Sequence, residues 1–136
     1  MEARIELKRV YRHPIGAVWS AISEATQISE WFIKADFVAQ IGYEYTFTHE
    51  STTITGTVLD VQPPRILVYT WVLGGVSTKV HWRLEETAEG TLLTLVHDGI
   101  EAYGDSAATW FANFRHGWQS CAEELETYLS KTVVDG

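Results

Sequence analysis

Hydrophobic and polar residues alternate near the start of the chain, from residue 3 to residue 11. Ile5 and Leu7 stand between Arg4, Glu6 and Lys8. A period of two is typical of a strand with one buried and one solvated face. The sequence therefore predicts that the chain opens with a strand.

Two short helices are predicted next. Pro14 suits the first position of a helix, because its missing N–H would have no helical partner there. The residues that follow it at helical spacing are Ile15, Val18, Trp19 and Ile22. A second helix is predicted to begin at Thr26, whose hydroxyl can cap the first turn. Its apolar residues are Ile28, Trp31 and Phe32.

From about Phe37 to Asp98 the pattern predicts strands. Gly74-Gly75 and Glu89-Gly90 each suit a two-residue hairpin loop. Two such loops align Leu67 with Trp82, and Trp82 with His97. Paired residues share a sheet face, so one face collects Leu67, Tyr69, Trp71, Thr78, Val80, Trp82, Leu84, Leu93, Leu95 and His97. The other face collects Ser77, Lys79, His81, Arg83 and Glu85.

The strand before these hairpins has two possible orientations. Pro63-Pro64 predicts a loop of three or four residues, because proline cannot donate a ladder hydrogen bond. A slip of one residue exchanges Leu59 and Val61 for Val58 and Asp60 on the inner face. The facing of this strand stays open. Gly42 and Gly56 are candidates for bends or bulges that would let the sheet curve.

A long helix is predicted at the end, from about Asp105 or Ser106 to Ser130 or Lys131. Its apolar stripe consists of Trp110, Phe111, Phe114, Trp118, Cys121, Leu125, Tyr128 and Leu129. At 1.5 Å per residue such a helix is about 40 Å long. Gly117 lies inside it. Because a helical glycine is unfavourable, it indicates a close approach by the sheet, a kink or a ligand.

The order of these elements predicts an α+β fold in which the helices pack on a single antiparallel sheet. No linker, repeat or low-complexity tract interrupts the order, and 136 residues suit one domain, residues 1–136.

Charge and cysteine content narrow the possible partners and compartments. The net charge of −8 and the pI near 5.0 argue against nucleic acid and anionic membranes. A single cysteine, Cys121, excludes an intramolecular disulfide. The amino terminus lacks the apolar stretch of a signal peptide, and no run of about 18 uncharged apolar residues predicts a membrane helix. A cytoplasmic protein is expected.

Several segments, in this order, resemble a known family. They are HPIGAVWSAIS, ISEWF, GTVLDVQPPRILVYTW, EGTLLTLVHDGI and HGWQSCAEELETYL, and they span nearly the whole chain. The sequence is similar to homologues of the activator of the 90-kDa heat-shock protein ATPase, within the START-like, birch-pollen-allergen-like superfamily. The resemblance implies the helix-grip fold, in which a curved antiparallel sheet grips the C-terminal helix around a cavity. It implies no single reaction, because the superfamily contains carriers, cyclases, receptors and co-chaperone domains.

An aromatic cavity is predicted between the sheet and the long helix. The residues predicted to line it are Trp31, Tyr45, Phe47, Tyr69, Trp71, Trp82, His97, Trp110, Phe114 and Trp118. Tyr45, Tyr69 and Tyr103 offer hydroxyls that can orient a polar group of a ligand. Rings at helical spacing also fill cores, so a packed interior is the alternative.

Catalysis has one candidate residue. His97 is placed on the inner face, where it can act as a hydrogen-bond donor or general base, or can simply be satisfied by a neighbour. The histidines lack zinc spacing, and Asp98, Glu101 and Asp105 lack the pattern of a calcium loop. Cys121 is predicted to be a core residue. No metal or cofactor is expected.

Three functions are weighed. The first is binding of a small hydrophobic or amphipathic molecule, which the inner face favours. The second is regulation of a heat-shock chaperone, within a stress response, which rests on the family resemblance alone. The third is a cofactor-free hydrolase or cyclase that uses His97. The outer face at Val68, Thr70 and Val72 is also unusually apolar, which predicts a patch for a homodimer.

Overall fold

The computed structural model describes residues 4–134, and it contains one sheet and three α-helices in that range. The first strand, β1 (Ile5–Tyr11), is followed by α1 (Ile15–Ser23) and α2 (Ala25–Trp31). Six strands come next: β2 (Lys34–Asp36), β3 (Glu44–His49), β4 (Thr52–Gln62), β5 (Ile66–Leu73), β6 (Val76–Thr87) and β7 (Gly90–Asp98). A 3-10 helix, η1 (Ile100–Ser106), leads into α3 (Ala107–Val134).

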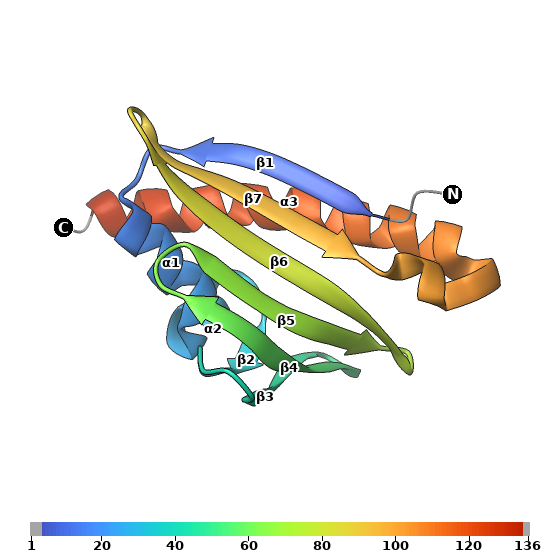
Figure 1. The fold of residues 1–136 in the computed structure, drawn as a ribbon. Helices are drawn as coiled ribbons and strands as arrows, with labels where there is room; N and C mark the ends of the chain where they lie inside the picture. Colours follow the sequence, from blue (N-terminus) through green and yellow to red (C-terminus); the bar gives the residue numbers. More distant parts are fainter. Residues whose placement is uncertain (1–3, 135–136) are drawn as a thin grey trace.

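The seven strands form one antiparallel sheet in the order β1-β7-β6-β5-β4-β3-β2. The sheet twists, and α3 runs behind it along its length, with α1 and α2 beside the C-terminal part of α3 (Figure 1). The predicted α+β helix-grip architecture is confirmed. A sheet with one apolar face and a long amphipathic helix can each bury that apolar surface only against the other.

Both short helices begin one residue away from their predicted starts. Pro14 has an extended backbone with ψ 148° and is the N-cap of α1, so Ile15 is the first helical residue. The prediction that Thr26 caps α2 is wrong, because α2 begins at Ala25. Glu24 ends α1 and also begins α2, where its carbonyl accepts the N–H groups of Gln27 and Ile28. A junction of one residue leaves no room for a separate cap.

The predicted pairing of β5 with β6 is confirmed. Leu67 pairs with Trp82 and Leu73 pairs with Val76, so Gly74-Gly75 is the two-residue loop. Both glycines have positive φ, 66° and 79°, which other residues adopt only at a cost.

The predicted pairing of β6 with β7 is wrong by two residues. Trp82 pairs with Leu95 instead of His97, and the loop is Ala88-Glu89 because Thr87 pairs with Gly90. Gly90 serves another purpose: a Cβ there would lie 2.2 Å from the carbonyl oxygen of Tyr11. Since side chains alternate with a period of two, a shift of two residues leaves every side chain on its predicted face.

A bulge resolves the facing of β4. Val58 pairs with Tyr69 and Val61 pairs with Leu67, and the register shifts between them. Both valines therefore lie on the inner side, while Leu59 is 41% exposed. Gly56 lies just before the bulge. A Cβ at this position would be 2.0 Å from the carbonyl oxygen of Thr70, so a larger residue would clash there. Neither simple register could have described this strand.

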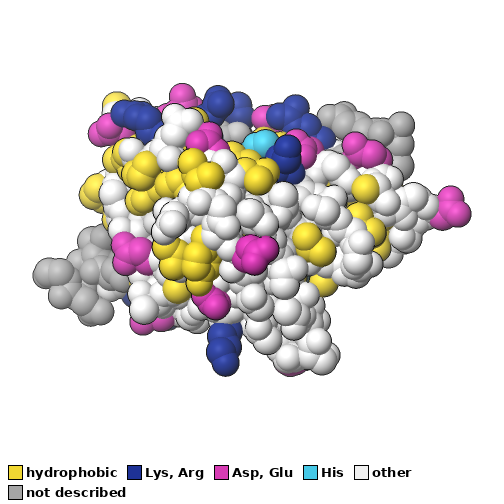
Figure 2. Space-filling view, turned by 60° about the horizontal axis from the view of Figure 1, so that its bottom comes forward, with side chains coloured by type: hydrophobic (Ala, Val, Ile, Leu, Met, Phe, Trp, Pro, Cys, Tyr) yellow, Lys and Arg dark blue, Asp and Glu magenta, His cyan; other side chains and the backbone are white. Residues whose placement is uncertain are grey.

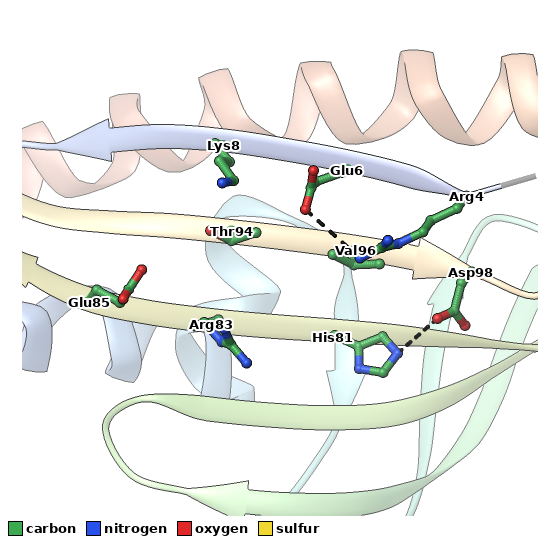
Figure 3. A pocket seen from close by; sticks show the side chains of 9 residues that line it. All are labelled: Arg4, Glu6, Lys8, His81, Arg83, Glu85, Thr94, Val96 and Asp98. Carbon is green, nitrogen blue, oxygen red and sulfur yellow. Dashed lines mark ion pairs between the residues drawn. The ribbon is translucent and has the colours of Figure 1, made fainter. Parts of the chain in front are cut away.

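The face predicted to be inner is buried throughout. Each of its ten predicted residues is at most 5% exposed, and the eight hydrophobic ones belong to one core with the apolar stripe of α3. The outer face of β1, β7 and β6 is charged. Arg4, Glu6 and Lys8 stand beside residues of β7, and β6 lies beyond them (Figure 3).

The surface carries its hydrophobic side chains in small groups. On the face drawn in Figure 2, yellow side chains lie in separate patches, and most Lys and Arg side chains lie near the upper rim. The large hydrophobic residues that are most exposed are Val10, Val38, Ile41 and Leu59. Within residues 4–134, no helix combines the length and the hydropathy that crossing a membrane requires.

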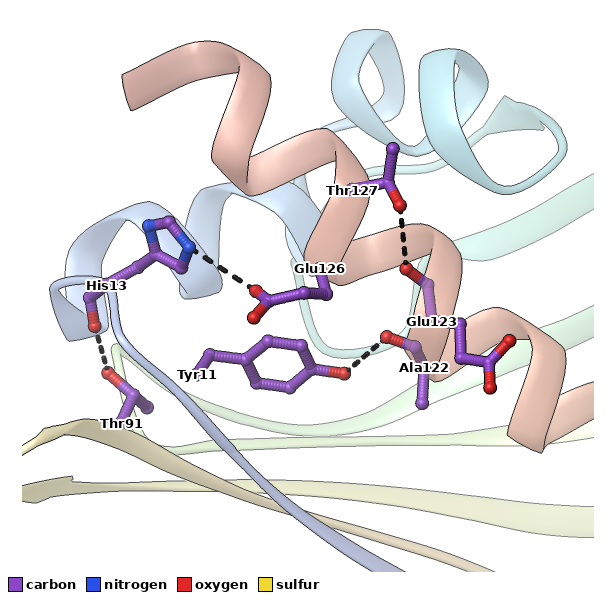
Figure 4. A network of polar contacts seen from close by, with 7 residues as sticks. All are labelled: Tyr11, His13, Thr91, Ala122, Glu123, Glu126 and Thr127. Carbon is purple, nitrogen blue, oxygen red and sulfur yellow. Dashed lines mark hydrogen bonds and ion pairs between the residues drawn. The ribbon is translucent and has the colours of Figure 1, made fainter. Parts of the chain in front are cut away.

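Polar contacts fix the C-terminal half of α3 to the end of β1 (Figure 4). The Tyr11 hydroxyl is buried and donates to the Ala122 carbonyl at 2.9 Å. His13 Nε2 lies 3.4 Å from a carboxylate oxygen of Glu126. The Thr91 hydroxyl donates to the His13 carbonyl at 2.8 Å, which ties β7 to the same corner.

Candidate ligand-binding site

His97 lies in the middle of a series of buried hydrogen bonds that runs from Trp118 to the carbonyl of Trp71. It is fully buried on β7, and its Nδ1 accepts the indole N–H of Trp118 at 2.9 Å. A tryptophan N–H can only donate, so neutral His97 carries its proton on Nε2. That nitrogen donates to the Thr78 hydroxyl at 2.7 Å, and the hydroxyl donates to the Trp71 carbonyl at 3.1 Å.

The electrostatics of His97 keep the ring neutral. Burial, with a smaller contribution from the charge of His81, lowers the pKa of His97 to about 4. At neutral pH both ring nitrogens are therefore engaged and neither is free to accept a proton. The interpretation of His97 as a satisfied structural residue fits this geometry, and its partners are Trp118 and Thr78.

The tyrosine hydroxyls predicted to orient a ligand are used inside the fold. Tyr69 accepts the indole N–H of Trp82 at 2.8 Å. Tyr45 donates to the Thr70 carbonyl at 2.7 Å, and Tyr103 donates to the Leu73 carbonyl at 2.6 Å. Burial raises the pKa of all three phenols, so they stay protonated.

The described residues between the sheet and α3 are closely packed. The space around Trp82, Leu95, Cys121 and Leu125 amounts to about 10 Å³, which is at the lower limit of what a bound water needs, roughly 10–15 Å³. Aromatic rings fill the interior. The ring centres of Tyr45 and Phe47 lie 4.6 Å apart, and those of Tyr45 and Tyr69 lie 5.0 Å apart.

An apolar hollow opens at the surface where the end of α2, the strand β5 and the helix α3 meet. Its volume is about 110 Å³, and we call it the Trp71 pocket. Its lining residues are Phe32, Trp71, Asn113, Phe114, Gly117 and Trp118. Aromatic rings form its walls. The ring centre of Trp118 lies 5.8 Å from that of Phe32 and 5.3 Å from that of Trp71.

The predicted ligand-binding residues divide into two groups. Trp71, Phe114 and Trp118 line the Trp71 pocket, and His97 lies against Phe114 at 4.6 Å. The remaining predicted residues belong to the packed interior or the far end of α3: Trp31, Tyr45, Phe47, Tyr69, Trp82 and Trp110. Trp31 donates its indole N–H to the Ala21 carbonyl, and Trp110 stacks on Tyr103 at 4.4 Å.

Gly117 gives the pocket its open side. A Cβ at this position would meet no atom within 4 Å, so close packing does not explain the glycine. The helix α3 also continues through it from Ala107 to Val134. Of the three explanations drawn from the sequence, a close approach by the sheet is therefore wrong. Asn113, one turn earlier, lines the same hollow and has no signal in the sequence pattern.

Trp71, which lines the pocket, also has an unpaired donor. It is 5% exposed, and its indole Nε1 has no hydrogen-bond partner among the described residues. Leaving a buried donor without a partner costs about 1–3 kcal/mol. An acceptor that reached this nitrogen would recover that energy.

Other chemistry finds less support. No group of three or more His, Cys, Asp and Glu residues in residues 4–134 is arranged to hold a metal ion. Cys121 is buried and its burial raises the pKa of the thiol, which keeps it protonated and unreactive. A hollow of about 280 Å³ on the outer sheet face contains the His81–Asp98 pair at 3.2 Å, but its three Lys and Arg side chains are balanced by three acidic side chains.

Comparison with known proteins gives a family and several structural relatives. Residues 12–130 match the family model described as Activator of Hsp90 ATPase homolog 1-like protein. Protein MLL2253 of Mesorhizobium loti is 26% identical, with TM-score 0.89, over 95% of this chain and 98% of its own. Protein BH1534 of Bacillus halodurans is 27% identical, with TM-score 0.80, over 93% and 96%.

A third relative is CalU16 of Micromonospora echinospora, which is 28% identical with TM-score 0.77. The similarity covers 93% of this chain and 73% of that one. No curated protein matches the sequence of this chain.

Proposed function

Because the chain belongs to the Activator of Hsp90 ATPase homolog 1-like family, whose fold suits ligand binding, we propose that it binds a small, uncharged aromatic or amphipathic molecule in the Trp71 pocket. The observation that supports this most directly is the buried indole Nε1 of Trp71, which has no partner among the described residues. Such a donor selects a ligand with a hydrogen-bond acceptor beside an apolar ring.

The size of the pocket limits the ligand. Sites for drug-sized molecules are about 300–1,000 Å³, whereas an apolar cavity of about 150 Å³ holds one benzene ring. A hollow of about 110 Å³ therefore takes a single ring or one end of a longer molecule. Neutral His97 behind Phe114 offers no charge to pair with an ionised group, which favours an uncharged ligand.

A pair of matched compounds tests the proposed contact. Acetophenone has a ring and a carbonyl acceptor, and ethylbenzene has a similar shape without the acceptor. We expect acetophenone to bind more tightly and to shift the indole N–H signal of Trp71 in a ¹⁵N-edited NMR spectrum. Equal binding of both compounds, or no shift of that signal, contradicts the proposal.

The substitution Gly117→Leu separates binding from stability. Leucine fills the open side of the pocket and should abolish acetophenone binding. It should also raise the free energy of unfolding by about 0.5–1 kcal/mol, because glycine is unfavourable inside a helix. Ser120→Leu, at an exposed position of the same helix, is the control and should leave binding unchanged. Titrations followed by tryptophan fluorescence measure both variants, and retained binding in Gly117→Leu excludes this pocket.

Regulation of a heat-shock chaperone is the second candidate, and the family match over residues 12–130 favours it. It predicts that the purified chain changes the ATPase rate of a 90-kDa chaperone. The third candidate, a cofactor-free hydrolase or cyclase, loses support because His97 has no free nitrogen and its pKa is about 4.

A further inference from the structure

The free edge of β1 is the most basic part of an acidic protein. The chain has a net charge of −8 and ten Lys and Arg residues. Half of these ten lie on or next to β1, or face it from α3: Arg4, Lys8, Arg9, Arg12 and Arg115. Glu6 is the one acidic residue between residues 4 and 12.

The same edge has no neighbour within the sheet. β1 is the outermost strand, and its single partner in the described chain is β7. The outer edge of β1 therefore presents backbone N–H and C=O groups that another extended segment can pair with. The opposite outermost strand, β2, has only three residues and offers a much shorter edge.

A groove runs beside this edge. Its volume is about 230 Å³, and we call it the β1 groove. β1 and the preceding residue contribute Arg4, Ile5, Glu6 and Leu7, and α3 contributes Phe111, Arg115 and Gln119 at intervals of four residues. Leu7 and Phe111 are half-buried, so the groove combines apolar contact area with charge. A strand added to β1 lies about 4.8 Å away, which places its inward side chains over these residues of α3.

We infer that the edge of β1 and the β1 groove form a docking site for an acidic, extended peptide segment of a partner protein, which adds to the sheet as an eighth strand. Inward side chains of the peptide contact Leu7 and Phe111, with Arg115 close by. Outward side chains lie beside Arg4 and Lys8, which project from the outer face of β1 in Figure 3. This is recognition by strand addition, in which backbone hydrogen bonds supply affinity and side chains supply specificity.

Charge selects this occupant over a second copy of the chain. Two β1 strands paired edge to edge would bring two cation-rich segments together, and like charges directly opposite one another are destabilising. The same repulsion disfavours basic strands, whereas the cations attract acidic ones. This site lies on the outside of β1 and shares no residue with the Trp71 pocket.

A capped seven-residue peptide of alternating glutamate and valine tests the inference on the full chain. We expect it to shift backbone amide signals of residues 5–11 and 111–119 in ¹⁵N NMR spectra. The peptide with lysine in place of glutamate should not bind. A glutamate peptide N-methylated at alternate residues should not bind either, because it cannot form a strand ladder. No shift along β1, or equal binding by the lysine or the N-methylated peptide, overturns the inference.

Matched charge reversals locate the site. Arg4→Glu combined with Arg115→Glu should weaken binding about tenfold or more, because both cations that attract the peptide are replaced by anions that repel it. Lys34→Glu combined with Arg65→Glu changes the net charge equally, at exposed positions away from the groove. This control should weaken binding by no more than about twofold, since distant charges are screened by salt. Equal losses in both double variants would show that net charge alone attracts the peptide, and would contradict a site at β1.

Discussion

At the scale of single residues, His97 shows how a polar group can belong to an aromatic core. The ring is fully buried, and both of its nitrogens are bonded, to Trp118 and to Thr78. These bonds remove most of the penalty of burying a polar group and set one tautomer. The residue that looked most catalytic in the sequence therefore joins the sheet to α3.

Acid should destabilise the protein through His97. Its pKa is about 4 in the folded chain and about 6.5 when unfolded, so the unfolded state binds more protons between these values. The stabilisation is fully present above pH 6.5 and is lost as the pH falls through about 4, with a total of roughly 3 kcal/mol. Urea unfolding measured from pH 7.5 to pH 4 checks this.

The variant His97→Gln identifies the source of that pH dependence. Glutamine does not titrate, so its free energy of unfolding should fall less steeply between pH 6.5 and pH 4, even though the variant is less stable at pH 7.5. An unchanged slope would assign the effect to other groups.

At the scale of elements, close approaches of the backbone decide the register of the sheet. Gly90 begins β7 with φ 147°, and the chain leaving β1 passes directly over it. Gly56 allows β5 and the Tyr45 ring to approach β4 in the same way. Both glycines look like turn or bend residues in the sequence, but each is required by a neighbour that is distant along the chain.

Gly90→Ala should therefore destabilise the protein strongly, by about 3 kcal/mol or more, since the new Cβ would overlap the Tyr11 carbonyl and the φ is strained. Gly16→Ala is the matched control. It lies in α1 with no atom near the added Cβ, so it should be neutral or stabilising by up to about 1 kcal/mol. Thermal unfolding compares the two, and equal midpoints would show that the close approach relaxes freely.

At the scale of the whole molecule, both proposed binding surfaces lie at the edges of a closely packed interior. The space between the sheet and α3 is occupied by aromatic rings, while hollows open at the Trp71 pocket and beside β1. A closely packed core is rigid, so the residues around its edge are held in fixed positions.

Self-association is a prediction at this same scale. The outer side of β5 carries Val68 and Val72, both half-buried, and their strand neighbours His81 and Ser77 are polar. The sequence predicts a dimer patch here. Sedimentation velocity over a concentration series tests it: a dimer that Val72→Lys dissociates supports the patch, and a monomer at every concentration contradicts it.

The sequence determined the architecture because hydrophobic periodicity is a local property. The alternation around Trp82 and the stripe that includes Trp118 each define one apolar face, and the two faces can be buried only against each other. Even the wrong pairing of Trp82 with His97 kept both residues on the correct face, since the error was two residues.

Tertiary structure alone decided whether the interior is hollow. The sequence places Tyr45, Tyr69 and Trp82 on the inner face, but whether such rings leave a cavity or fill it depends on distances between elements that no pattern encodes. The same holds for the free donor of Trp71 and for the opening at Gly117: a hydrogen-bond partner or a neighbouring atom comes from segments far apart in the chain, and only the folded chain brings them together or leaves them apart.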